Sequence, residues 1–159
     1  MSEPLATYLN DHLAGSVAAL DLLGHLERSR AGSDLGAFFA ILRADIEADQ
    51  AELAALIARL GVTQGGVRKA VAWVAEKVAR LKLAADDPAG GPLKLLESVE
   101  VLAVGIHGKG SLWRALAAAA EANPALAGSD YARLAARADE QRGRVEAVRL
   151  DAARAALGG

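Results

Sequence analysis

Four long stretches of the sequence repeat apolar side chains every three or four residues, which is the spacing of one face of an α-helix. They cover about residues 3–30, 34–60, 93–122 and 130–157. Each would be roughly 40 Å long at about 1.5 Å per residue. Residues that interrupt helices separate them, among them Gly61 and Pro124. Four rods of nearly equal length predict a helix bundle.

A shorter fifth segment, at about 67–83, repeats valine at helical spacing and is followed by a loop at 86–92 that is rich in Gly, Pro and Asp. Short loops join the first two long helices and the last two, so we expect two antiparallel pairs, with the fifth segment as a crossover helix. By helical phase, Trp73 on this segment should be the less buried tryptophan. Trp113 should be buried, on the same stripe as Leu116.

The composition agrees with an all-α protein. Hydrophobic residues make up 53% of the chain but aromatic residues only 4%, so the apolar content comes from Ala, Leu and Val rather than from large rings. Ala and Leu are strong helix formers. A length of 159 residues is typical of one domain, and we expect residues 1–159 to form a single helical bundle.

Charge and cysteine content exclude several classes of function. The formal net charge is −2, which offers no surface for neutralising phosphates, so we expect no nucleic-acid partner. The absence of cysteine excludes disulfides, thiolate nucleophiles and zinc fingers. The longest apolar runs, such as 115–120, are far shorter than the roughly 20 residues of a membrane span. With no basic and apolar leader at the start, we expect a cytoplasmic protein of bacterial type.

Three motifs, YLNDHLAG at 8–15, GIHGK at 105–109 and LWRAL at 112–116, together with the helix order, resemble the ferritin-like superfamily. Within it, the chain is similar to bacterial members that have no assigned activity. The resemblance covers nearly all five predicted helices. It implies a four-helix bundle of two antiparallel pairs with one shorter crossover helix.

The resemblance also directs attention to metal binding, because di-iron members of the superfamily place Glu-x-x-His motifs on two of the four helices. The chain has three histidines. The residues three positions before them are Leu9, Leu22 and Val104, so no Glu-x-x-His or Asp-x-x-His motif is present. The di-iron ligands of the family therefore cannot be transferred to this chain.

Asp49 nevertheless interrupts the apolar series of the second predicted helix, at a position where the next apolar residue should stand. A lone carboxylate is costly to bury. It therefore either lies at the edge of the stripe with access to water or has partners in a polar layer. Counted along the predicted helices, the candidate members of such a layer are His12, Glu52, His107, Lys109, Gln141 and Arg142.

Two interpretations of this layer remain open. In one, His12, Asp49, Glu52 and His107 bind a metal ion as an altered ligand set. In the other, Lys109, Gln141 and Arg142 pair with the carboxylates, and a salt-bridge network occupies the place that metals hold in relatives. We favour the network because a buried cation removes the need for a metal.

Glycines at 105, 108 and 110 surround Lys109 and invite comparison with a phosphate-binding loop. The spacing Gly-x-x-x-x-Gly-Lys-Ser/Thr and a preceding strand are both missing. Glycines at these intervals would instead let another helix approach closely or kink the helix.

These features predict a non-catalytic helical-bundle protein that acts by binding or by self-association into a homo-oligomer. The alternative is a metal-binding oxidoreductase or metal-storage protein of iron or di-iron-like type. We predict no cofactor beyond that alternative metal ion.

Overall fold

The computed structural model describes residues 2–63, 76, 79 and 91–158. Within them lie four long helices and no strand: α1 (Glu3–Ser29), α2 (Asp34–Arg59), α4 (Gly91–Ala120) and α5 (Tyr131–Leu157). A short 3₁₀ turn, η2 (Pro124–Leu126), precedes α5. The prediction of an all-helical bundle is confirmed. The expected helix at 67–83, apart from residues 76 and 79, and Trp73 lie outside the described residues.

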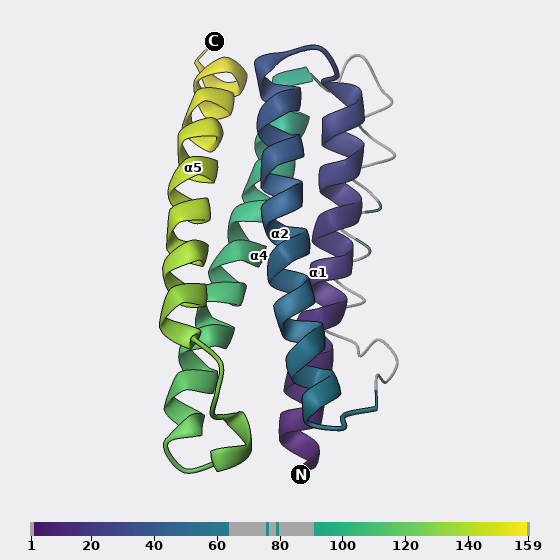
Figure 1. The fold of residues 1–159 in the computed structure, drawn as a ribbon. Coiled ribbons are helices and arrows are strands. Elements are labelled where there is room, and N and C mark those ends of the chain that lie inside the picture. The colour runs from purple at the N-terminus through teal and green to yellow at the C-terminus, as the bar shows by residue number, and fades with distance from the viewer. Residues whose placement is uncertain (1, 64–75, 77–78, 80–90, 159) are drawn as a thin grey trace.

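The helices form two antiparallel pairs, α1 with α2 and α4 with α5 (Figure 1). α1 begins at the end of the bundle where the N-terminus lies, and α2 returns to that end. α4 then begins at the opposite end, so α2 and α4 run in the same direction. Short connections alone do not permit this order. Among the described helices, not one combines the length and apolar character needed to cross a bilayer.

Local signals explain where the helices begin and end. The side chain of Ser33 caps α2 by accepting a hydrogen bond from the backbone N–H of Gly36, at 3.1 Å. Gly61 ends α2 with a φ of +64°, a conformation that favours glycine. The side chain of Asp130 caps α5. α4 begins two residues earlier than predicted, at Gly91, because Pro92 fits the first turn of a helix, where its missing N–H costs nothing.

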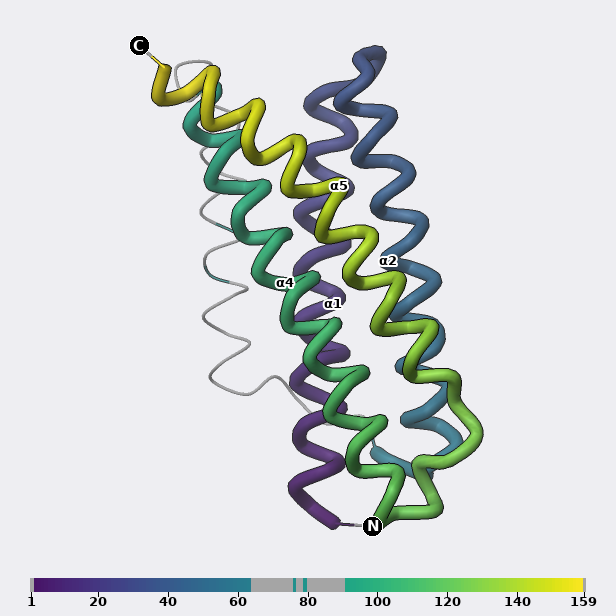
Figure 2. The backbone as a smooth tube through the Cα atoms, turned by 90° about the vertical axis from the view of Figure 1, so that its left-hand side faces the viewer, coloured from purple at the N-terminus to yellow at the C-terminus, as the bar shows by residue number. Residues whose placement is uncertain are grey.

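The α4–α5 pair is inclined relative to the α1–α2 pair (Figure 2), and the core between them consists of two hydrophobic clusters. The cluster nearer the N-terminal end includes Leu9, Leu53, Leu116 and the predicted buried Trp113, which is 1% exposed. The other includes Phe39, Ile46 and Leu102, together with Val145 and the end of α1. Asp49, Lys109 and Gln141 lie between the two clusters along their helices.

The connection between α1 and α2 yields a stability prediction. A Cβ atom at buried Gly36 would overlap the backbone carbonyl oxygen of Arg30. Gly36→Ala should therefore lower the free energy of unfolding by about 2 kcal/mol, as overpacking does. Urea denaturation measures the change.

The matched control for Gly36→Ala is Gly143→Ala on α5, where an added Cβ meets no described residue beyond its own helical turn within 4 Å. Because alanine is the better helix former, this change should raise the free energy of unfolding by about 0.5–1 kcal/mol. Equal effects of the two substitutions would contradict the packing seen at Gly36.

Candidate functional site

A buried ion pair joins α2 to α4 at the middle of the bundle. Asp49 is 1% exposed and Lys109 15% exposed, and Lys109 Nζ lies 2.5 Å from Asp49 Oδ2. Gln141 of α5 donates from Nε2 to the same carboxylate oxygen at 2.9 Å and accepts a hydrogen bond from Lys109 at Oε1. Three helices therefore contribute one polar side chain each to a closed network.

The second oxygen of Asp49 faces another cation, Arg137. Arg137 Nη2 lies 3.1 Å from Asp49 Oδ1 and donates to the backbone carbonyl of Asp45 at 3.3 Å. Arg137 was not among the predicted partners, although it stands one helical turn before Gln141 and shares its face. We call Asp49, Lys109, Arg137 and Gln141 the ionic layer.

Further ion pairs extend along the line where α2 meets α5. Asp45 Oδ2 lies 2.5 Å from Arg144 Nη2, and Glu52 Oε1 lies 2.8 Å from Arg133 Nη2. Nearer the end of the bundle, Arg59 donates to two backbone carbonyls of the turn before α5, at 3.0 and 2.9 Å. Acidic groups on α2 thus face arginines on α5 on both sides of Asp49.

The other predicted residues do not join the ionic layer. Glu52 is 43% exposed and pairs with Arg133. His107 is exposed. Arg142 is also exposed, and its Nη2 atom lies 4.0 Å from Asp139 Oδ1. His12 is partly buried on α1, where its ring makes an edge contact with Tyr8 at a centroid distance of 4.7 Å.

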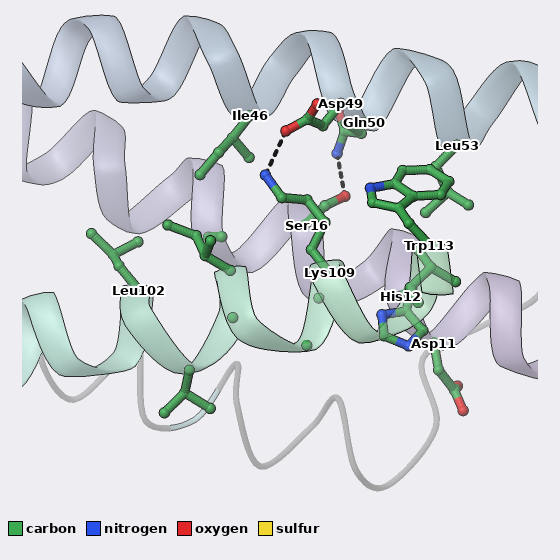
Figure 3. Close-up of a pocket in the computed structure, with 17 residues that line it drawn as sticks. Asp11, His12, Ser16, Ile46, Asp49, Gln50, Leu53, Leu102, Lys109 and Trp113 are labelled. Atoms are coloured by element: carbon green, nitrogen blue, oxygen red, sulfur yellow. Dashed lines mark hydrogen bonds and ion pairs between the residues drawn. The ribbon is translucent and has the colours of Figure 1, made fainter. Parts of the chain in front are cut away.

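A cavity of about 240 Å³ lies beside the ionic layer, between α1, α2 and α4 (Figure 3). We call it the α1–α4 cavity. Most of its lining is apolar, and the polar side chains in it come from all three helices. The described residues that line it include Asp11, His12, Gly15, Ser16, Asp49, Gln50, Leu53, Gly105, Gly108, Lys109 and Trp113.

The glycines explain why space remains here. Apart from the glycine's own helical turn, an added Cβ at Gly15, Gly105 or Gly108 would have no atom of the described residues within 4 Å. The expectation of a close helix approach is therefore not met by the described helices at Gly105 and Gly108, which line the cavity. It holds at Gly110, where an added Cβ would lie 3.4 Å from the Cβ of Ala138 on α5.

Burial changes the protonation chemistry of two cavity residues. Desolvation lowers the pKa of Lys109 from its usual value, and the charge of Asp49 opposes this change. Desolvation also lowers the pKa of His12, with Asp11 acting in the opposite direction. Both changes favour the uncharged form of a base at the cavity wall.

The side chains at this place do not fit a metal centre of the kind that the resemblance implies. Among the described residues, no three His, Asp or Glu side chains converge closely enough to hold a metal ion. Both oxygens of Asp49 already face cations, Lys109 and Arg137. Metal ligands need free oxygen or nitrogen lone pairs, whereas Asp49 Oδ2 accepts from Lys109 and Gln141, and Oδ1 lies against the cation of Arg137.

Removing one charge from the ionic layer should have a large effect on the free energy of unfolding. Asp49→Asn would leave Lys109 and Arg137 near the core without their counter-charge, so the free energy of unfolding should fall by about 3 kcal/mol. Denaturation by urea at neutral pH provides the measurement. Glu52→Gln, which breaks an exposed ion pair on the same helix, is the control and should have a much smaller effect. An Asp49→Asn variant as stable as the parent would show that the layer does not need this charge.

The lowered pKa of His12 should make the stability of the protein depend on pH. Because its pKa is lower in the folded protein than the ordinary value of 6.5, the unfolded chain takes up a proton first as the pH falls. The free energy of unfolding should therefore decrease as the pH drops from about 7.5 through 6.5, until the folded pKa is passed. The slope should be smaller in His12→Gln.

Denaturation curves between about pH 7.5 and pH 5 measure this slope. The control is His107→Gln, which removes an exposed imidazole from α4. Equal loss of slope in the two variants would contradict the assignment to His12.

Comparison of the chain with protein-family models, curated proteins and solved structures found no match. The resemblance to ferritin-like proteins therefore stands on the helix order and the sequence motifs. Because fold alone does not imply function, the evidence for function comes from the geometry of the ionic layer and the α1–α4 cavity.

Proposed function

We propose that this protein is a non-catalytic, ferritin-like helical bundle that acts by binding. The supporting observation is the ionic layer, in which Asp49 is almost fully buried and held by Lys109, Gln141 and Arg137. Di-iron members of the superfamily hold metals between inward-facing carboxylates in the bundle core. In this chain the ammonium group of Lys109 supplies positive charge next to the core carboxylate.

The contacts of the layer favour a structural role over a catalytic one. A general base must come within hydrogen-bond distance of the proton that it removes, whereas both oxygens of Asp49 already face cations. The ammonium group of Lys109 donates to Asp49 and Gln141. A lowered lysine pKa occurs at catalytic sites, but structural ion-pair networks produce it as well.

The α1–α4 cavity supports the binding part of the proposal. Ligand sites are typically concave and mostly apolar, with a few placed polar groups, and they occur between the helices of bundles. This cavity has an apolar wall that includes Ile46, Leu53 and Leu102, with Ser16 and Gln50 as polar groups. Ser16 and Gln50 are held by each other, at 2.8 Å between Gln50 Nε2 and Ser16 Oγ.

A metal-binding oxidoreductase or storage protein has less support. Asp49 would have to exchange Lys109 for a metal ion and recruit His12 from the opposite side of the cavity. Glu52 and His107 face elsewhere.

The proposal of a binding function includes binding of a second copy of the chain, that is, self-association into a homo-oligomer. Sedimentation equilibrium measures the molar mass in solution, and the mass of a single chain at every concentration would exclude self-association.

The proposal predicts that metal removal has no effect. Protein purified without chelator should contain less than stoichiometric iron, manganese or zinc by elemental analysis. Its melting temperature should be the same with and without a chelator, because only a ligand that binds the folded state raises that temperature. The control is Asp49→Asn, whose response to chelator should match that of the parent.

Stoichiometric metal that stabilises the parent but is absent from Asp49→Asn would overturn the non-catalytic proposal in favour of a metal site at Asp49.

A further inference from the structure

The indole of Trp113 brings an unused hydrogen-bond donor to the α1–α4 cavity. Trp113 is 1% exposed, and among the described residues no atom accepts a hydrogen bond from its Nε1. On the side of Tyr131 the two rings stack, with centroids 6.4 Å apart. The indole nitrogen faces the part of the cavity where Ser16 and Gln50 meet (Figure 3). An indole nitrogen can only donate, and buried donors are nearly always paired, so the geometry calls for an acceptor inside the cavity.

At this part of the cavity, the described polar side chains bond to each other rather than to Trp113. The hydroxyl of Ser16 donates to the carbonyl of Leu13 at 2.6 Å and accepts from Gln50. An oxygen atom of a bound molecule would complete the hydrogen bonding of Trp113. A ligand that lacks an oxygen would leave the donor unpaired.

The charges around the cavity favour an uncharged ligand. Lys109 is the one Lys or Arg among the described lining residues, and it is paired with Asp49. Asp11 adds a negative charge at the wall, and the lowered pKa of His12 disfavours a second cation there. An anion would therefore lose its hydration without gaining a free counter-charge.

Size and surface favour a small, mainly apolar ligand. The volume of about 240 Å³ is below the roughly 300–1,000 Å³ of sites for drug-sized ligands. Leu53, Leu102 and Leu112 contribute to its apolar wall. Gly15 and Gly108 keep space open where any other residue would place a side chain.

We propose that the α1–α4 cavity binds a small, uncharged, mainly apolar molecule with a carbonyl-type oxygen, which accepts a hydrogen bond from Trp113 Nε1. This inference rests on the proposed binding function and names the ligand class for it. The ionic layer forms one side of the cavity, where the ammonium group of Lys109 is paired with Asp49.

Acetophenone and ethylbenzene are the test probes, because they have similar shapes and differ in the carbonyl oxygen. The sequence contains two tryptophans, so a Trp73→Phe background leaves the indole N–H resonance of Trp113 alone in the NMR spectrum. Titration with acetophenone should shift this resonance to saturation. Affinity for acetophenone should exceed that for ethylbenzene by about tenfold, the effect of one hydrogen bond. Benzoate should bind more weakly than acetophenone.

Two pairs of variants locate the site. Trp113→Phe retains an aromatic ring but removes the donor, so acetophenone should bind no better than ethylbenzene. Gly108→Leu fills the cavity and should abolish binding of both probes. Gly143→Leu adds the same side chain on α5, where an added Cβ also has no atom within 4 Å, and should leave binding unchanged. Calorimetry measures the affinities, and thermal denaturation shows that each variant is folded.

Three results would overturn the inference: no saturable shift with acetophenone, equal affinities for the two neutral probes in the parent, or unchanged binding in folded Gly108→Leu. Tighter binding of benzoate would overturn the uncharged ligand class. These outcomes are independent of the metal measurements. Failure of the ketone test with metal-free, chelator-insensitive protein would refute the ligand class alone.

Discussion

The contact between Asp49 and Lys109 is the interaction on which the arrangement of the helices depends. Hydrophobic clusters rich in leucine lie on both sides of it, and such cores tolerate alternative packings. A buried charge does not, because moving one helix by a turn, about 5.4 Å, would separate the carboxylate from the ammonium group and leave both desolvated. Gln141 bonds to both groups, so we infer that the ionic layer sets the register of α2, α4 and α5.

The layer also shapes the space beside it. Arg137 and Lys109 both pair with Asp49, while the pair Asp45 and Arg144 continues the line of charges between α2 and α5. On the other side, α1 contributes the small residues Gly15 and Ser16 at the level where its neighbours carry polar groups. Space that larger side chains would fill stays open. Open space in a core costs stability, and sites that break packing rules are commonly functional.

Part of this site could be predicted from the sequence. Asp49 stood out because a carboxylate occupied an apolar position, and Lys109 and Gln141 were placed near it by counting residues along the helices. Glu52 was also a candidate, but three residues along a helix is enough to turn a side chain about 60° to the side, and here it meets Arg133 at the surface. Arg137 was missed because no interruption of an apolar series marks it. The free donor of Trp113 has no sequence signal at all.

The sequence by itself determined the helices, their antiparallel pairs and the buried Trp113, because periodicity, capping residues and loop length act between residues that are close along the chain. Only the tertiary structure decided that Lys109 rather than Arg142 meets Asp49, that His107 is exposed, and that Gly105 and Gly108 border a cavity. These outcomes depend on the rotation of each helix about its axis and on the inclination of one pair against the other. Both follow from packing between distant segments, which no local pattern specifies.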